Sequence, residues 1–187
     1  NRFNRKIMRN KKNTNFSRIF KKNKYNFILL IIVLIISLFL FSKLVSYISN
    51  RSLLEYDTEI ITIKNKDSEI DALTLKDIRK MGQSEMKIVT NKGEEFKVAG
   101  VSIEKILTRE KINPNLNNTI EFSDEFGHKT NMSMETALEV NRVLLVYKID
   151  NKANMDYKKD LGSFIIIDKQ EKDSSKWIKN IQVINIK

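Results

Sequence analysis

The chain has 187 residues and a formal net charge of +11, and it contains no cysteine. The absence of cysteine excludes disulfides, a thiolate nucleophile and thiolate ligands for zinc, copper or iron–sulfur clusters. Its five glycines are scattered, which excludes a glycine-rich phosphate-binding loop. The high Asn and Lys content is typical of a low-GC Gram-positive genome, and because the first residue is Asn1 we expect part of a longer gene product.

The positive charge is concentrated at the N-terminus. Residues 1–26 hold ten Lys or Arg and no Asp or Glu, whereas the chain from Arg51 onward has 23 residues of each sign. Between these parts, residues 27–48 are almost entirely apolar. A hydrocarbon core about 30 Å thick needs about 20 helical residues, so residues 27–48 predict one transmembrane helix.

Three side chains suit the membrane–water interfaces of this predicted helix. Tyr25 and Tyr47 would lie about 33 Å apart along a helix axis, which matches the two aromatic belts. Lys43 can extend its amine to the outer interface. The bias of Lys and Arg toward residues 1–26 predicts a cytoplasmic tail and an extracytoplasmic C-terminal domain. We therefore expect a single-pass protein of the cell membrane whose first partner is the lipid bilayer.

Two other interpretations of the N-terminal region agree less well with its residues. A cleaved signal peptide has the same charged start and apolar middle, but it needs small residues at its cleavage site. Leu, Lys and Tyr interrupt the candidate site at residues 42–49. A basic arm for nucleic acid would place its cations on a folded face. Here the cations stop where the apolar segment begins, so no nucleic-acid partner is expected.

The rest of the chain predicts a stalk at residues 49–56 and one α+β domain at residues 57–187. Predicted strands are the β-branched or alternating segments at residues 56–63, 85–91, 94–99, 119–123, 129–133, 142–149, 163–168 and 178–186. Short helices are predicted to follow Thr74, Ser102 and Ser133, with a capping-box-like pattern at Thr74. In the last strand, Ile181 and Val183 are expected to alternate with polar residues.

Five segments occur in a recognisable order within residues 70–187. They are a short helix at 73–78, a Gly-Val turn and helix at 100–107, a Ser-Asp turn at 123–127, an apolar strand at 144–147 and a Ser-x-Lys-Trp segment at 174–177. In this order they resemble the molybdopterin-binding domain of the sulfite oxidase-like oxidoreductase superfamily. The resemblance implies a mixed β-sheet domain with short helices.

The same resemblance implies that the metal chemistry of the family is lost. In that family a cysteine thiolate ligates molybdenum, and the equivalents here, Val89 or Thr90, supply no thiolate. A family Gly-x-Pro-x-Arg segment helps to hold the pterin, whereas residues 162–166 read Gly-Ser-Phe-Ile-Ile. A guanidinium is a forked donor that Ile cannot replace. We therefore expect no cofactor and assign no catalytic residue and no metal ligand.

The resemblance leaves three residues as a candidate cofactor- or anion-binding set. It implies that Ser174 and Lys176 could contact a phosphate or pterin. Thr90 is an oxygen ligand for molybdenum in the alternative case that molybdopterin is bound. These three residues are the site predicted from the sequence.

Other reactive side chains are expected to be structural or solvated. Histidine commonly acts as a general base, but His128 has no obvious partner in the sequence and lies beside a glycine turn. Trp177 is expected to pack in the core while its neighbour Lys176 stays solvated. The acidic pairs at residues 94–95 and 124–125 lie at turns, and the second lacks the alternating ligands of a calcium loop.

Three functions follow from these observations. The first is a cofactor-free domain with a binding or assembly role in the cell envelope, whose partner is a small anion or an envelope protein. The second is a molybdopterin-dependent oxidoreductase that holds its metal without cysteine. The third is an unrelated enzyme or binding module whose likeness to the family is a coincidence.

Overall fold

The computed structural model describes residues 24–187, so most of the predicted basic tail at residues 1–26 lies outside the described residues. The first element described is the helix α2 (Lys24–Leu54). It contains a segment of 21 residues, Tyr25–Val45, that is long and apolar enough to cross a membrane. The protein buries none of this segment. A helix that is apolar on every side needs lipid around it or protein over it.

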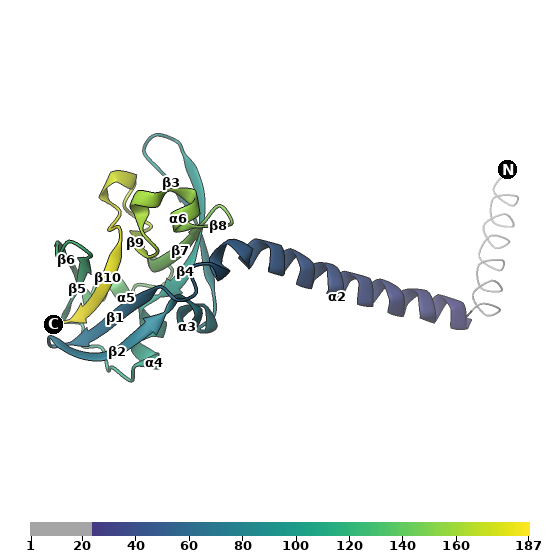
Figure 1. The fold of residues 1–187 in the computed structure, drawn as a ribbon, viewed down its shortest axis with the longest axis horizontal. Coiled ribbons are helices and arrows are strands. Elements are labelled where there is room, and N and C mark those ends of the chain that lie inside the picture. Colours follow the sequence, from purple (N-terminus) through teal and green to yellow (C-terminus); the bar gives the residue numbers. More distant parts are fainter. Residues whose placement is uncertain (1–23) are drawn as a thin grey trace, which may run out of the picture. The chain divides into compact units, whose positions relative to one another are not determined.

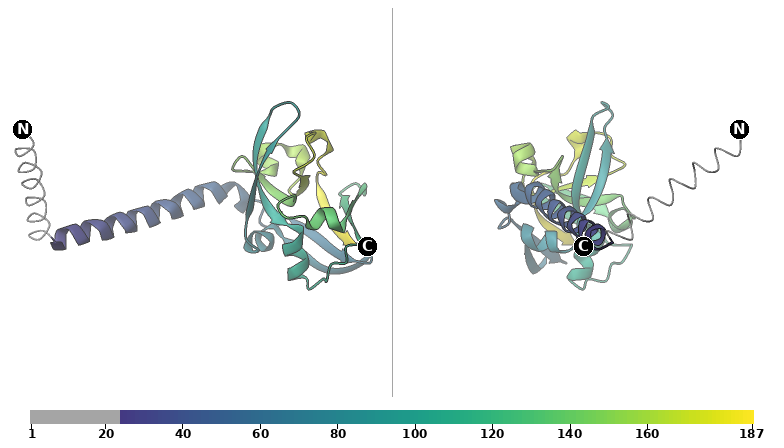
Figure 2. Two further views of the ribbon diagram at one scale, coloured as in Figure 1. Left: turned by 180° about the vertical axis from the view of Figure 1, so that it is seen from behind. Right: turned by 90° about the vertical axis from the view of Figure 1, so that its right-hand side faces the viewer.

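The chain divides after Tyr47 into two compact units, and the second unit contains two five-stranded β-sheets (Figures 1 and 2). The strands of the first sheet are, in spatial order, β2 (Ser68–Thr74), β1 (Ile60–Asn65), β10 (Ile181–Ile186), β5 (Thr119–Asp124) and β6 (Lys129–Ser133). The strands of the second sheet are β3 (Ser84–Val89), β4 (Glu95–Ser102), β7 (Val143–Ile149) and β8 (Lys152–Ala153), with β9 (Ile165–Asp168) also paired to β7. Only β1 and β10 pair in parallel among the described strands.

Short helices connect these strands, and the α+β class predicted from the sequence is confirmed. They are α3 (Leu75–Lys80), α4 (Ile103–Arg109), α5 (Met134–Leu138), α6 (Asn154–Tyr157), η1 (Lys159–Leu161) and η2 (Ser174–Lys176). Thr74 caps α3 as predicted, because its hydroxyl accepts a hydrogen bond of 3.1 Å from the Asp77 backbone N–H. The helix predicted after Ser102 is α4, which buries Ile103, Ile106 and Leu107.

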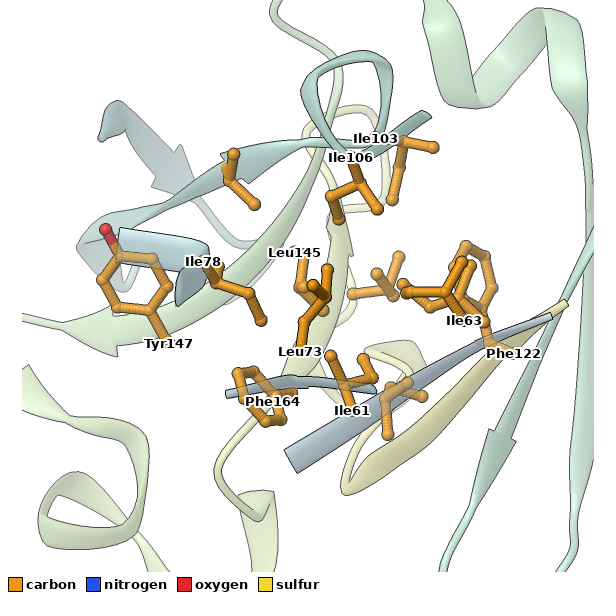
Figure 3. Close-up of a cluster of buried hydrophobic side chains, with 14 of the residues drawn as sticks. Ile61, Ile63, Leu73, Ile78, Ile103, Ile106, Phe122, Leu145, Tyr147 and Phe164 are labelled. Carbon is orange, nitrogen blue, oxygen red and sulfur yellow. The ribbon is translucent and has the colours of Figure 1, made fainter. Parts of the chain in front are cut away.

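The main hydrophobic core lies between the two sheets (Figure 3). Ile61 and Ile63 enter it from β1 and Phe122 from β5, while Leu145 reaches it from β7. A second cluster covers the opposite face of the second sheet, where Leu144 and Val146 of β7 contact residues of β3, β4 and β9. Alternate residues of β7 therefore serve two cores, and all seven of its residues are buried.

Strand β2 is missing from the sequence-based prediction. It pairs with β1 across a tight turn in which Lys66 and Asp67 have φ values of 51° and 66°. Turns of this kind usually carry Gly or Asn, and neither residue is at these positions. Most of β2 is also exposed, and Ile70 is 44% exposed, so the strand has no clear apolar alternation. Leu73 is the one side chain of β2 that is buried in the main core, so the strand gives little apolar signal in the sequence.

The prediction of a stalk at residues 49–56 is wrong for residues 52–56, which are part of the second unit. Residues 49–54 are helical, and Leu53 is completely buried in the main core. The Ser52 hydroxyl donates to Asp156 at 2.5 Å and accepts from the Ala153 backbone N–H at 2.6 Å. The Tyr56 hydroxyl donates to the same carboxylate at 2.7 Å. A buried side chain and three hydrogen bonds make residues 52–56 part of the domain.

The predicted alternation of the last strand holds for Ile181 but is wrong for Val183. The register of β10 against β5 shifts between these two residues. Ile181 is buried and Val183 is only partly buried, whereas Ile184 and Ile186 enter the core. A bulge adds one residue to a strand and so reverses which side chains face inward after it.

Gly100 lies where β4 and β7 come closest. A Cβ atom at this position would overlap the backbone carbonyl oxygen of Leu145. The register between the two strands also shifts between Ala99 and Gly100. Only glycine allows this approach, because the obstructing atoms belong to the backbone and cannot rotate away.

We predict that Gly100→Ala lowers the free energy of unfolding by about 3 kcal/mol, since the added methyl group must displace β7. Gly93→Ala is the matched control, because φ is 78° at Gly93 and no atom lies within 4 Å of the added Cβ. The control should cost about 1 kcal/mol from backbone strain alone. Urea unfolding of the detergent-solubilised chain, followed by the fluorescence of Trp177, measures both. Equal losses would contradict the close approach of the two strands.

Candidate functional site

Thr90 closes the turn between β3 and β4. Its backbone N–H donates to the Glu94 carbonyl at 2.9 Å, and its hydroxyl oxygen accepts from the Glu94 backbone N–H at 3.2 Å. The side chain is nearly inaccessible, with 5% of the residue exposed. A hydroxyl that is buried and holds a turn together is not presented to a ligand.

The predicted Ser174 and Lys176 lie in η2, close to this turn. The backbone N–H of Asn91 donates to the carbonyl of Lys172 at 2.9 Å, which joins the β3–β4 turn to the loop before η2. Ser174 is partly buried, and the Lys176 ammonium lies 3.4 Å from the Glu171 carboxylate. The structure thus brings the Thr90 turn and the η2 loop together. It engages Thr90 within the turn and pairs Lys176 with a neighbouring acid.

Residues 162–166, which the resemblance relates to pterin binding, pack within the domain. Gly162 has φ of 71°, and a Cβ there would lie 2.6 Å from the Asn180 Cα. Phe164 and Ile166 are each 1% exposed and belong to the main core. Because Ile166 is surrounded by apolar side chains, a guanidinium at that position would be buried without a partner. Gly162 is required by the positive φ and by the nearby backbone of Asn180. The other residues of this segment, 163–166, are buried.

These positions do not fit molybdopterin. The hydroxyl oxygen of Thr90, which the resemblance offers as a ligand, is used by the turn. The position that resemblance assigns to a phosphate-binding arginine is apolar and buried. Within residues 24–187, no group of three or more His, Asp or Glu side chains is arranged to hold a metal ion. Of the positions implied by the resemblance, only Lys176 carries a cation, and it is paired with Glu171.

Lys148 is a buried cation that sequence analysis did not identify. It lies on β7 opposite Ala99 of β4, which in turn pairs with Glu85 of β3. Lys148 is only 4% exposed, and burial lowers the pKa of its ammonium, while the charge of Glu85 acts in the opposite direction. The signal in the sequence is a single Lys within the otherwise apolar predicted strand 142–149. No side chain beside it in the sequence suggested a partner.

Polar groups from β3 and its preceding turn surround this part of the sheet. Glu85 is bound by Lys97 at 2.8 Å and by the Gln83 amide at 2.9 Å, and the Lys97 contact is the main reason that its pKa is lowered. Burial raises the pKa of the Tyr147 hydroxyl to about 12. A shallow groove of about 520 Å³ lies over the outer part of this hairpin, and it is lined by Glu85, Met86, Lys87, Glu95, Lys97 and Asp150. Lys87–Glu95 and Lys97–Glu85 pairs neutralise most of its charge.

A second groove, of about 590 Å³, lies between α3 and α4. Its lining residues are Lys80, Met81, Ser102, Glu104, Lys105, Thr108 and Arg109. Lys80 is paired with Asp77 at 3.3 Å, and Arg109 lies 3.4 Å from Glu110. Lys105 donates to the Gly82 carbonyl at 3.0 Å. Lys105 makes no ion pair within the described part of the chain, so this groove offers one cation to a small anion.

Glu110 is an unusual acid at the end of α4. Its side chain is 10% exposed, and its Oε1 atom has no hydrogen-bond partner in the described structure. Burial raises the pKa of its carboxyl group, and the nearby charge of Asp71 adds to the effect. Burial and Asp71 thus disfavour the charged form of Glu110 relative to a solvated carboxyl group, while the charge of Arg109 acts in the opposite direction.

Two other polar groups are structural. The Arg142 guanidinium binds Asp168 through two nitrogens at 3.0 Å each and Glu139 at 2.6 Å, which ties the start of β7 to the end of β9. His128 is exposed as expected, and its Nδ1 lies 2.8 Å from Asp124. The Asp124 carboxylate also accepts the backbone N–H groups of Phe126 and His128. Both networks shape turns and strand ends.

The predicted interfacial residues all lie on α2. Tyr25 and Tyr47 are 85% and 62% exposed, respectively. The ammonium of Lys43 lies 5.5 Å from the centre of the Phe39 ring, one helical turn earlier. These exposed side chains are available to the headgroup layers, which is the condition for the predicted belts.

No protein-family model matches this chain, and no curated protein matches it. Among solved structures, its fold is similar to that of the sulfane dehydrogenase SoxCD from Paracoccus pantotrophus, with a TM-score of 0.54 and 11% sequence identity. The match covers 70% of this chain and 38% of that chain, so this chain spans well under half the length of SoxCD. At this identity the likeness shows the fold alone. It supports the distant fold relation expected from the sequence resemblance.

We predict that Thr90→Val costs about 1 kcal/mol of stability, because the Glu94 backbone N–H loses its acceptor. Thr90→Ser keeps the hydroxyl and should retain most of that stability. Urea unfolding of each variant, followed by Trp177 fluorescence, measures the difference. A Thr90→Val variant as stable as the original chain would show that the hydroxyl does not hold the turn.

We predict that Glu110→Gln stabilises the domain at pH 7 by on the order of 1 kcal/mol. A raised pKa in the folded state means that Glu110 destabilises the fold as the pH rises above its ordinary value of 4.5. The gain should therefore be small at pH 4 and grow between pH 4.5 and the raised pKa. Glu104→Gln, at an exposed position of the same helix, is the control and should change stability by less than about 0.5 kcal/mol. A gain that does not depend on pH would rule out ionisation of Glu110 as its cause.

Proposed function

We propose that this chain is a single-pass membrane protein that presents a cofactor-free, sulfite oxidase-like domain in the cell envelope. The N-terminal tail is cytoplasmic and the domain is extracytoplasmic. The domain binds a partner protein or a small anion instead of carrying out molybdenum chemistry. The apolar segment Tyr25–Val45 and the ten cations before it support the membrane location.

One observation carries the proposal for the domain. Ile166, at the position where the family has its phosphate-binding arginine, is 1% exposed and lies within the main core. A single substitution can change the role of a surface residue. A core residue is closely packed against many neighbours, which restrict its substitution. In this domain, residues 162–166 therefore stabilise the fold. The proposal assigns them no role in holding a pterin.

A second candidate is a molybdopterin-dependent oxidoreductase with oxygen ligation by Thr90. The hydrogen bond between Asn91 and Lys172 favours it, because that bond brings the Thr90 turn next to the loop of Ser174 and Lys176. This candidate requires the Thr90 hydroxyl to leave the Glu94 N–H and turn outward. The burial of Thr90 makes the cofactor-free proposal the better supported of the two.

The proposal predicts that full-length chain purified from molybdate-supplied cells contains neither stoichiometric molybdenum nor pterin. Elemental analysis and mass spectrometry of the purified chain measure both, and a molybdopterin enzyme purified in parallel is the control. In the same cells, protease added outside should digest residues 48–187, while an epitope on the N-terminal tail survives until lysis.

Stoichiometric molybdenum and pterin would overturn the cofactor-free assignment and favour the second candidate. A domain that resists protease until the cells are lysed would overturn the topology. The two measurements are independent, so each part of the proposal can fail without the other.

A further inference from the structure

We propose that two copies of this chain associate through strand β3, which pairs antiparallel with β3 of the second copy about Met86. The pairing joins the second sheets of the two copies edge to edge. The inference goes beyond the proposed function and does not depend on the membrane anchor, since it concerns the folded domain. Strand β3 is the outermost strand of its sheet, and the β3–β4 hairpin extends beyond the neighbouring elements (Figures 1 and 2).

Every second residue of β3 directs its backbone N–H and C=O groups away from β4. In an antiparallel pair, hydrogen-bonded and non-hydrogen-bonded residue pairs alternate along the strands. The Thr90 N–H donates to the Glu94 carbonyl at 2.9 Å, which fixes where this alternation begins. With the observed register, the residues whose backbone groups face outward are Glu85, Lys87 and Val89.

The other side of β4 agrees with this assignment. Lys97 lies opposite Lys87, and its carbonyl accepts a hydrogen bond of 2.8 Å from the backbone N–H of Asp150, on the side of β4 away from β3. The backbone groups of Lys97 and Lys87 therefore face away from each other. No other strand within residues 24–187 pairs with the outer edge of β3. This edge offers a row of backbone donors and acceptors to a further strand.

The charged side chains of β3 determine which strand fits this edge. Glu85 and Lys87 are both exposed, and because they are two residues apart they lie on the same face of the sheet. Within one copy, Glu85 is paired with Lys97 at 2.8 Å and Lys87 is paired with Glu95. Lysine on an edge strand usually opposes pairing. Here acid and base alternate, so the same strand running in the opposite direction is complementary.

One antiparallel register, centred on Met86, satisfies the charges. It places Glu85 opposite Lys87 of the second copy, and because both residues face outward, each such pair can exchange its two backbone hydrogen bonds. Across the joint, the side chains then alternate in sign in the order Glu95, Lys87, Glu85 of the second copy and Lys97 of the second copy. A shift of two residues would place Lys87 opposite Lys87 of the second copy, and like charges directly opposite are destabilising.

The edge strands of the first sheet, β2 and β6, lack this pattern. The pairing of β1 with β2 contains a register shift, and the charged residues within β2 are two acids, Glu69 and Asp71. Strand β6 carries one charged side chain, Lys129, which is paired with Glu121 of β5. Neither strand presents alternating charges to a second copy of itself. The charge pattern therefore favours β3 as the edge that pairs.

Two charge reversals test the pairing in the full-length chain, with sedimentation equilibrium in density-matched detergent as the measurement. Lys87→Glu places an acid opposite Glu85 of the second copy, and Glu85→Lys places two lysines opposite each other. Because two attractive pairs become repulsive in either variant, we expect each variant to associate about tenfold more weakly, or weaker still. Lys169→Glu, at an exposed position after β9, changes the charge equally and should leave the association unchanged.

A mixture of the two variants separates charge pairing from loss of folding. In a mixed pair, each acid of the Lys87→Glu chain lies opposite a lysine of the Glu85→Lys chain, so the mixture should associate about as strongly as the original chain. An original chain that stays monomeric would overturn the proposal, and so would a mixture that stays monomeric. A dimer that neither reversal weakens would also overturn it, and would assign the association to another surface such as α2.

Discussion

The burial of β7 on both faces is the constraint on which the domain depends. Leu145 and Tyr147 pack toward the core between the sheets, while Leu144 and Val146 pack toward the second cluster. A strand that serves two cores cannot shift by one residue without exposing both sets of side chains. The close approach at Gly100 and the Arg142–Asp168 pair hold β7 against β4 and β9. The position of β7 therefore helps to fix the strands that bear the turns and grooves of the domain.

Two glycines show how the backbone restricts this arrangement. The glycines at positions 100 and 162 are needed because backbone atoms lie where a Cβ would be. Ile166 is part of the main core, and an arginine in its place would be buried without a partner. The likeness to SoxCD, at 11% identity, is one of fold alone.

Short sequence patterns predicted those elements that depend on residues close together in the chain. The Thr74 cap, the hairpin around Gly93 and the turn at Asp124 were all evident from residues within a few positions of one another. Strand β2 was not, because its turn uses Lys66 and Asp67 with positive φ and its side chains are mostly exposed. The inward residues of β10 were assigned only in part, because the bulge after Ile181 depends on pairing with β5. Of the predicted site, the structure joins the Thr90 turn to the η2 loop, a contact between residues about 80 positions apart.

The sequence by itself determined the apolar span, the asymmetric charge around it and the α+β class, because these depend on composition and short-range periodicity. Only the tertiary structure decided that Ser52 and Tyr56 belong to the domain, that Thr90 is closed into a turn, and that Lys148 is buried within β7. Each of these facts concerns what surrounds a side chain. The surroundings are supplied by residues distant in the chain, so no local pattern contains them.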